Sequence, residues 1–310
     1  MEQGTVVKST SKLFRVRTPE GELVDCAIKG KFRERDIKTT NPLAVGDKVT
    51  FERLSDREQG QGVITELEGR RNYIIRKSSN LSKEAQVIAA NIDQAVLMVT
   101  LMNPETPVEF IDRFLVTAEA YSIPAVILFN KSDIYGREEK IRLEYLKQLY
   151  EKIGYGTLTI SVREKTNADS VISLFRDRIS LLAGNSGVGK SSLLNLLNPS
   201  LNLKTEEISG YHRQGRHATT YPEMHMMPFG GAVIDTPGIR GFGVIDLEKG
   251  ETYHFFPEIF RRSSMCRFYN CLHINEPDCA VRSAVESEEI AWSRYRSYLS
   301  IMEGDEGKYR

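Results

Sequence analysis

The order of three short motifs is the feature that most limits what this chain can fold into. Residues 184–191 read Gly-Asn-Ser-Gly-Val-Gly-Lys-Ser, a loop whose backbone N–H groups and lysine hold nucleotide phosphates. The tetrad Asn-Lys-Ser-Asp at residues 130–133 precedes this loop, whereas domains that carry both motifs normally have it afterwards. Asp235, in Asp-Thr-Pro-Gly, follows both and is the acidic residue expected near a metal ion. This order predicts a nucleotide-binding sheet whose chain is circularly permuted.

Each of these motifs comes directly after an apolar run that is typical of a buried strand. The runs are residues 125–129 before the tetrad, 179–183 before the phosphate loop and 232–234 before Asp235. Residues 94–100 form a further run of this kind, and residues 108–121 carry apolar side chains at helical spacing. Because ligands in open α/β sheets bind at the carboxyl ends of the strands, we expect the motifs to form one site.

The tetrad is the element that reads a guanine base. Guanine presents two donors, N1–H and the exocyclic amine, and the Asp133 carboxylate can accept both. Adenine would leave that buried carboxylate without a partner, which is a strong basis for rejection. We expect Lys131 to lie against the purine ring and Asn130 to brace the loop. Ser161 and Val162 fit the backbone-donor loop that usually follows the base reader, although alanine commonly stands where Val162 is.

Other side chains are expected to bind the phosphates and the metal ion. Lys190 should neutralise the β- and γ-phosphates, and the Ser191 hydroxyl should bind Mg²⁺. A second hydroxyl should come from a switch within residues 215–220, where either Thr219 or Thr220 is suitable and the sequence does not choose. The predicted nucleotide-binding residues are Asn130, Lys131, Ser132, Asp133, Ser161, Val162, Gly184, Asn185, Ser186, Gly187, Val188, Gly189, Lys190, Ser191, Ser192, Asp235 and Gly238.

The residue after Gly238 is Ile239, at the place where small GTPases of the Ras type carry a water-orienting glutamine. Because isoleucine cannot hydrogen-bond water, hydrolysis must be slow, or another group or a partner must complete the site. We favour His217, within a glycine- and threonine-rich switch, as the catalytic residue. His212 and His225 are ordinary competitors, and a structural or RNA-contacting role for His217 stays open.

The composition of the chain restricts the cellular compartment and the kinds of partner that can be expected. A chain of 310 residues suggests two or three domains. Residues 1–83 hold 17 Lys and Arg against 12 Asp and Glu in a chain of zero net charge, which weakly favours a nucleic-acid partner over an ordinary solvated surface. No apolar run approaches the ~18 residues of a membrane span, and the start lacks the features of a signal peptide. We therefore expect a cytoplasmic protein without disulfides or membrane partner.

Residues 1–72 read as short strands separated by turn residues, which suits a small β-barrel. An OB-fold is the best interpretation because such barrels often bind RNA. A basic connection within this segment suits phosphate contact, and Phe32 within it suits base stacking. Its basic residues are the RNA-binding candidates Lys29, Lys31, Arg33 and Arg35. Cys26 alternates with polar neighbours and is expected in the core.

Residues 246–310 carry a cluster of metal-binding residue types. Three cysteines and a histidine fall within 14 residues and provide the four ligands of a closed tetrahedral zinc site: Cys266, Cys271, His273 and Cys279. The alternative is a set of unrelated core cysteines. Few apolar residues surround the cluster, so a structural Zn²⁺ would substitute for a core. The stripe of Val281, Val285, Trp292, Tyr295 and Leu299 predicts one amphipathic helix that packs back on this module.

The combination of motifs in this chain resembles the RsgA (YjeQ) family. These motifs are the tetrad, the phosphate loop, Gly-Arg-His-x-Thr-Thr, Asp-Thr-Pro-Gly, Phe-Pro-Glu at 256–258 and the Cys/Cys/His/Cys cluster. The resemblance covers nearly the whole chain. It implies a monomeric, circularly permuted GTPase that binds the small ribosomal subunit and its rRNA, is stimulated by the subunit, and acts as a checkpoint factor in its late maturation. It also supports His217 as the switch histidine and the four zinc ligands. Ala218 departs from the family, which usually has a third threonine there.

The fold class expected is therefore α/β: a circularly permuted P-loop GTPase domain at 73–245, an N-terminal OB-fold β-barrel at 1–72 and a C-terminal zinc-binding, mainly helical module at 246–310. Two other classes remain open. One is an ATPase, since a phosphate loop alone does not select the base. The other is an RNA-binding protein gated by nucleotide without significant turnover. Competition by GDP but not ADP would exclude the first, and GTP turnover raised by ribosomal particles would exclude the second.

Overall fold

The structure is a computed structural model that describes residues 1–10, 13–28, 42–54, 61–77, 85–204, 222–235 and 250–304. The chain forms two compact units, and each is described by itself. The first comprises Met1–Val96, Ala168–Ala183 and Lys190–Ile239, and the second comprises Leu97–Asn167, Gly184–Gly189 and Arg240–Arg310. Across the described ranges, no helix is both long and apolar enough to cross a membrane.

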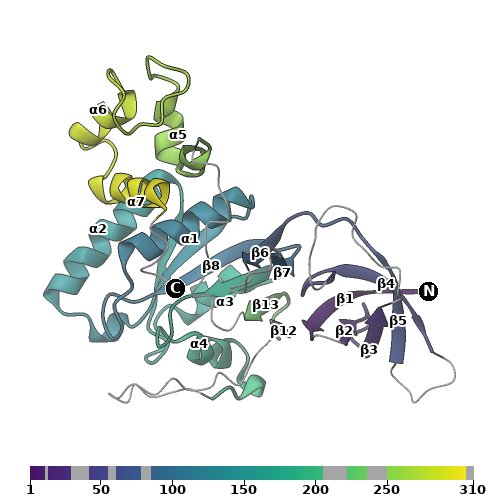
Figure 1. The fold of residues 1–310 in the computed structure, drawn as a ribbon. Coiled ribbons are helices and arrows are strands. Elements are labelled where there is room, and N and C mark those ends of the chain that lie inside the picture. Colours follow the sequence, from purple (N-terminus) through teal and green to yellow (C-terminus); the bar gives the residue numbers. More distant parts are fainter. Residues whose placement is uncertain are drawn as a thin grey trace. The chain divides into compact units, whose positions relative to one another are not determined.

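The N-terminal strands of the first unit close into a barrel (Figure 1). These strands are β1 (Glu2–Ser9), β2 (Phe14–Arg17), β3 (Leu23–Ile28), β4 (Lys48–Arg53) and β5 (Gln61–Leu67). Strand β1 pairs with both β2 and β4, β2 pairs with β3, and β5 joins β3 in parallel and β4 in antiparallel orientation. Alternate side chains, including Val16, Cys26, Phe51 and Ile64, fill the interior. This is the strand order of an OB-fold, and the predicted barrel is confirmed.

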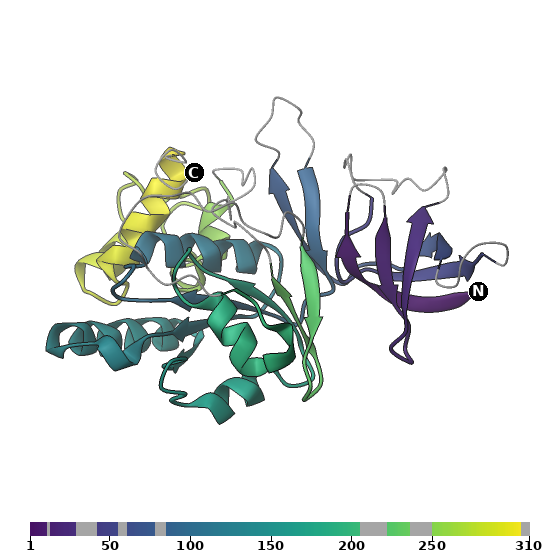
Figure 2. The ribbon, with the colours of Figure 1, turned by 90° about the horizontal axis from the view of Figure 1, so that it is seen from below.

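The rest of the first unit contains strands and helices that belong to the predicted α/β region. Its elements are β6 (Tyr73–Lys77), β7 (Ala85–Ala90), α3 (Ala168–Phe175), β11 (Ile179–Ala183), α4 (Lys190–Leu197), η2 (Pro199–Leu201), β12 (Glu223–Met226) and β13 (Ala232–Asp235). Strands β11 and β13 are parallel, and β12 is antiparallel to β13. The antiparallel hairpin β6–β7 (Figure 2) has no counterpart among the strands expected from the sequence.

The second unit begins within β8 (Gln94–Val99), whose first half belongs to the first unit. It continues with α1 (Val108–Ala120), β9 (Ala125–Phe129), η1 (Ser132–Ile134), α2 (Arg137–Ile153) and β10 (Gly156–Thr159). Strands β9 and β10 are parallel. All side chains of β8 are buried, as its continuous apolar run predicts for a strand covered on both faces. The tetrad at 130–133 begins where β9 ends, so the strand order places the base reader at a carboxyl end.

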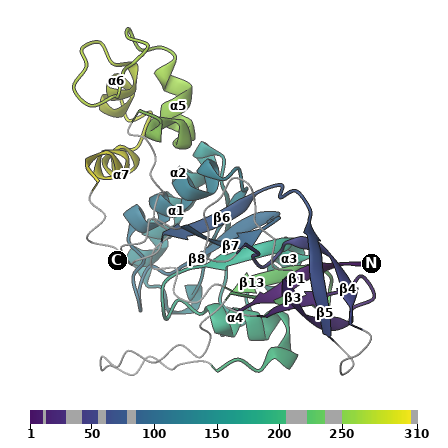
Figure 3. The ribbon, with the colours of Figure 1, turned by 45° about the vertical axis from the view of Figure 1, so that its right-hand side comes forward.

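The C-terminal module also belongs to the second unit, and Figure 3 shows its helix α7 lying over α1. Its elements are η4 (Thr252–Phe255), α5 (Pro257–Ser263), α6 (Ala280–Glu286) and α7 (Trp292–Glu303). The prediction of one helix after the cysteine cluster is wrong, because two helices are present. The chain turns between them, where Glu288 takes a left-handed conformation with φ of 60° and the Ile290 N–H bonds back to the Ala284 carbonyl at 3.0 Å.

Candidate functional site

The base reader and the phosphate loop touch each other within the second unit. The Asn130 side-chain amide donates to the Val188 carbonyl at 2.8 Å. The Lys131 ammonium donates to the Gly187 carbonyl at 2.8 Å and also to the Asn103 carbonyl. Asn130 is buried at 2% exposure, and it braces the phosphate loop as its place in the tetrad predicts. Two motifs more than fifty residues apart in sequence are therefore brought together by side chains of one of them.

Two glycines of the phosphate loop allow this close approach. Gly184 has φ of 146° and Gly189 has φ of 106°, conformations that residues with a side chain rarely adopt. A Cβ atom on Gly189 would lie 2.6 Å from the Asn130 amide nitrogen, and one on Gly184 would lie 2.4 Å from the Met98 carbonyl oxygen. Glycine is thus required at both positions by backbone conformation and by contact with β8 and the base reader.

The Asp133 carboxylate is held in orientation by the loop after β10. The Ser161 hydroxyl donates to Asp133 Oδ1 at 2.6 Å and accepts from the Glu164 N–H at 3.0 Å. The Val162 N–H, which we expected to face the nucleotide, donates instead to Asn130 Oδ1 at 3.1 Å. Ser132 contributes its N–H to the Ile160 carbonyl at 3.1 Å. Asp133 is exposed here, whereas the sequence argument took its carboxylate to be buried. Ser161 orients this carboxylate, and its exposure leaves it accessible to a base.

The lysines of the two motifs have perturbed acidity. Burial lowers the pKa of Lys131, although the Asp133 carboxylate acts in the opposite direction. Burial also lowers the pKa of Lys190, against the opposing effect of Asp235. Lys190 and Asp235 both lie in the first unit, at the start of α4 and at the end of β13. An ammonium group shielded from water in this way gains more from a phosphate than an exposed one does.

The remaining predicted residues fall into two groups. Asn185 and Ser186 lie in the phosphate loop, and Ser191 and Ser192 lie in the first turn of α4, directly after Lys190. The other predicted residues lie outside the part of the chain that the structure describes: Gly238, His217, Thr219, Thr220, Lys29, Lys31, Arg33 and Arg35.

The cysteine cluster has the dimensions of a metal site. The ligand atoms of Cys266, Cys271, His273 and Cys279 all lie within 4.8 Å of one another. The His273 Nδ1 atom is 3.5 Å from the Sγ atoms of Cys266 and Cys279, which are 3.9 Å apart. Tetrahedral zinc bonds of ~2.3 Å to sulfur imply sulfur–sulfur separations of ~3.8 Å. The donor set and its spacing therefore fit Zn²⁺. Burial raises the pKa of the Cys271 thiol to about 12.

The loop that carries His273 is held by Glu276 and Tyr298, which the sequence analysis did not identify, and by Tyr295, which it placed on a helix that packs on this module. The Glu276 carboxylate accepts from the N–H groups of Leu272 and Ile274 at 2.8 and 2.9 Å, and from Asn275 at 3.1 Å. From α7, the Tyr295 hydroxyl donates to the His273 carbonyl and the Tyr298 hydroxyl donates to the Leu272 carbonyl, both at 2.6 Å. The loop is thus preorganised by partners on both sides. The sequence offered two signals for these contacts, the Glu276 carboxylate close after a ligand and Tyr295 in the predicted stripe.

The family of the chain follows from comparison with known proteins. A family model described as the RsgA GTPase matches residues 67–245, and one described as the RsgA N-terminal domain matches residues 3–64. The chain belongs to the RsgA GTPase family. The predicted family resemblance and the expected class of enzyme, a GTPase, are confirmed.

Similar RsgA proteins match nearly the entire chain. A protein of Christiangramia forsetii named small ribosomal subunit biogenesis GTPase RsgA is 52% identical over 308 residues, 99% of this chain and 98% of that relative. A protein of Bacteroides fragilis with the same name is 50% identical over 309 residues, 99% of each chain. The match therefore includes the C-terminal module, which neither family model covers.

Two solved structures of this family share the fold. The crystal structure of YjeQ from Thermotoga maritima has a TM-score of 0.79 at 34% identity and covers 99% of both chains. YloQ, described as a circularly permuted GTPase, has a TM-score of 0.75 at 31% identity and covers 98% of this chain and 94% of its own. The predicted fold class, a permuted GTPase domain with an N-terminal barrel, is confirmed.

Proposed function

We propose that this RsgA-family chain binds the small ribosomal subunit and hydrolyses GTP to drive the late maturation of that subunit, which it then leaves as a checkpoint factor. The contact of Asn130 and Lys131 with the phosphate loop is the observation that carries the nucleotide part of this proposal. The subunit part is supported by full-length relatives named small ribosomal subunit biogenesis GTPases.

Guanine selection is assigned to the exposed Asp133 carboxylate. Ser161 holds one of its oxygens at 2.6 Å, which orients the carboxylate toward the two donors of guanine. Lys131 has its ammonium fixed on the phosphate loop, so the aliphatic part of its side chain is left to cover the purine ring. Ser132 and Val162 are assigned an indirect part in nucleotide binding, because their N–H groups hold the Ile160 carbonyl and Asn130 Oδ1 and so fix the base reader.

Phosphate and metal binding is assigned to the loop 184–191 and to the ends of α4 and β13. Backbone N–H groups from Gly184 to Gly189 surround the phosphates, and Lys190 neutralises them. The Ser191 hydroxyl and Thr219 or Thr220 would hold Mg²⁺, which would neutralise charge on the phosphates, with Asp235 as the acidic residue near the metal and Gly238 among the nucleotide-binding residues. Ser192 follows in the same helical turn and completes the nucleotide contacts.

Hydrolysis is assigned to His217 because Ile239 cannot orient water. An imidazole in the switch would position or activate the attacking water when the subunit completes the site. The chain alone is then slow, and the small subunit accelerates it. A switch histidine that acts together with the subunit would allow a GTPase without the glutamine of the Ras type to hydrolyse GTP.

The N-terminal segment is assigned to RNA binding, and the C-terminal segment is assigned to a structural zinc site. The barrel, 1–72, would bind rRNA through Lys29, Lys31, Arg33 and Arg35, and the segment 73–245 would act as the GTPase domain. In the module 246–310, Cys266, Cys271, His273 and Cys279 would hold one structural Zn²⁺, which supplies folding energy rather than chemistry. We place the protein in the cytoplasm as a monomer.

A hydrolysis assay with and without purified small subunits tests the proposal. We expect slow release of phosphate from GTP by the chain alone, marked acceleration by small subunits, and no acceleration by large subunits. GDP should inhibit and ADP should not. A chain that binds GTP and the subunit but never releases phosphate would show that nucleotide only gates RNA binding, and the proposed reaction would be wrong.

A further inference from the structure

The Tyr135 side chain makes a contact at the base reader that no motif describes. Its hydroxyl donates to the carbonyl oxygen of Asn130 and accepts from the N–H of Leu101 at 3.0 Å. The residue is 4% exposed and lies two positions after Asp133. Burial raises the pKa of its phenol to about 12, so the hydroxyl is protonated and can donate at any ordinary pH. It therefore ties the backbone of the base reader to the loop after β8.

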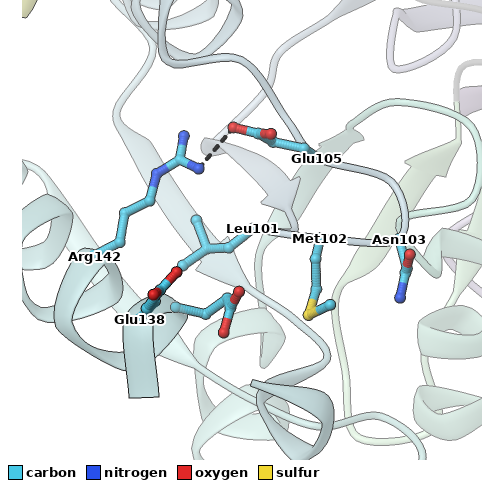
Figure 4. Close-up of a pocket in the computed structure, with 7 residues that line it drawn as sticks. Leu101, Met102, Asn103, Glu105, Glu138 and Arg142 are labelled. Atoms are coloured by element: carbon cyan, nitrogen blue, oxygen red, sulfur yellow. Dashed lines mark ion pairs between the residues drawn. The ribbon is translucent and has the colours of Figure 1, made fainter. Parts of the chain in front are cut away.

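That loop, residues 100–107, is fixed at further points. Its Asn103 carbonyl accepts from the Lys131 ammonium, and its Glu105 carboxylate pairs with Arg142 of α2 at 2.6 Å (Figure 4). The same loop lines a cavity of about 380 Å³ with residues of α2. Because the loop is held at several places, it offers a firm support against which Tyr135 can hold the base reader.

The other side of the base reader is held by the loop after β10. Ser161 binds the Asp133 carboxylate, and the Ile160 carbonyl accepts from the Ser132 N–H. The tetrad thus lies between two supports, and Tyr135 provides the hydrogen bond on the β8 side. Lys131 has a left-handed backbone with φ of 65°, an uncommon conformation for a residue with a side chain, so the backbone of this turn depends on such supports.

We propose that the Tyr135 hydroxyl is a positioning group for guanine recognition, which holds the Asn130 backbone so that the Asp133 carboxylate meets both donors of the base. This inference rests on the proposed role of Asp133. Removing the hydroxyl would leave the Asn130 carbonyl and the Leu101 N–H without this partner at positions only 2% and 4% exposed. Relaxation of the turn would then cost the carboxylate its alignment with the guanine amine.

The test compares two nucleotides that differ only in the amine that Asp133 reads. GDP carries the exocyclic amine and inosine diphosphate lacks it. In the Tyr135→Phe variant of the full chain, we expect GDP to bind about tenfold more weakly, the size of one lost hydrogen bond, while inosine diphosphate loses clearly less. The preference for GDP should therefore fall. Tyr145→Phe on α2, which is 55% exposed, is the matched control and should leave both affinities unchanged.

The outcomes separate this inference from the proposal on which it rests. If the parent chain prefers GDP but Tyr135→Phe keeps the same preference, the hydroxyl has no positioning role, whatever the change in overall affinity. An equal loss for both nucleotides would show a merely structural role and would also overturn the inference. A parent chain that binds the two nucleotides equally would instead remove Asp133 as the base reader.

Discussion

The buried arginine of α7 allows a quantitative test of how the C-terminal module is held to α1. The side chains of Arg294 and Asp112 are both 0% exposed, and Arg294 Nη1 lies 2.7 Å from Asp112 Oδ1. Arg294 also contacts Glu258, with Nε 2.6 Å from Oε1. The Asp112 oxygens accept further hydrogen bonds from Ser297 at 2.6 Å and Tyr150 at 2.9 Å. Loss of the arginine would leave a carboxylate buried without a cation.

The perturbation is Arg294→Met, which keeps an unbranched apolar side chain and removes the charge. Removing one partner of a buried ion pair costs ~3–5 kcal/mol, and a folded domain is stable by only ~5–15 kcal/mol. The module should therefore lose a large share of its free energy of unfolding. The double variant Asp112→Asn, Arg294→Met should recover most of this loss because the unpaired carboxylate is gone. Glu258 stays in both variants, so its contribution cancels when they are compared.

The loss of free energy of unfolding caused by Arg294→Met should also depend on pH. Burial raises the pKa of the Asp112 carboxyl, and Arg294 acts in the opposite direction. Without the arginine, the folded-state pKa should rise further above the unfolded value of about 4. A carboxyl of this kind binds its proton more tightly in the folded state, so stability falls as pH rises from the unfolded pKa through the folded one. The Arg294→Met penalty should be smallest in acid and largest above the folded pKa, and the double variant should lack this dependence.

The chain contains a single tryptophan, Trp292, and it is the first residue of α7. Its fluorescence therefore reports on the module during denaturant unfolding, measured at about pH 5 and about pH 8 with zinc in excess. Arg296→Met, an exposed change on the same helix, is the matched control. The parent chain at both pH values corrects for weaker zinc binding in acid. An Arg294→Met midpoint equal to the parent's at the higher pH, or no recovery in the double variant, would refute this reasoning.

Three further predictions concern zinc, hydrolysis and RNA. About one equivalent of zinc should co-purify, and Cys271→Ser should lower it and destabilise the module more than the nucleotide site; metal analysis that finds no zinc in reduced parent protein would contradict this. His217→Ala should keep GDP affinity but lose ~10²–10⁴-fold of the subunit-stimulated rate in single turnover, and normal hydrolysis on the subunit would reject the assignment. Reversing the charges of Lys29, Lys31, Arg33 and Arg35 should weaken subunit association and flatten its salt dependence, while intrinsic hydrolysis, measured alone, should not change.

The strands that deliver the motifs could be predicted closely from the sequence. β9 and β11 have the expected bounds because each is an apolar run that ends at a polar motif. The hairpin β6–β7 was missed, since its strands lie between the segments that the motifs define. The expectation that the motifs form one site rests on strand order, because carboxyl ends of parallel strands meet at one edge, and the hydrogen bond from Asn130 to Val188 brings two of the motifs into contact.

In the C-terminal helices, residue type alone predicts the wrong side chains to be buried. Trp292 was predicted on the packing face, but it is 61% exposed, whereas Arg294 is fully buried. An arginine is expected in solvent unless paired, and its partner Asp112 lies 182 positions earlier, so a pattern within one helix cannot reveal it. Some supports at the base reader, such as the Asn103 carbonyl, are backbone atoms and leave no residue signature. Tyr135 carries a hydroxyl, but nothing in the sequence indicates its partners.

The central claim, that Asp133 selects guanine, is tested most directly by the nucleotide preference of Asp133→Asn. The change replaces one acceptor of the carboxylate with a donor, which suits the carbonyl of xanthine where guanine has its amine. Dissociation constants of GDP and xanthosine diphosphate should be measured for the parent and variant chains side by side. We expect the parent chain to prefer GDP and the variant to prefer xanthosine diphosphate. A variant that still binds GDP as tightly as the parent would contradict it.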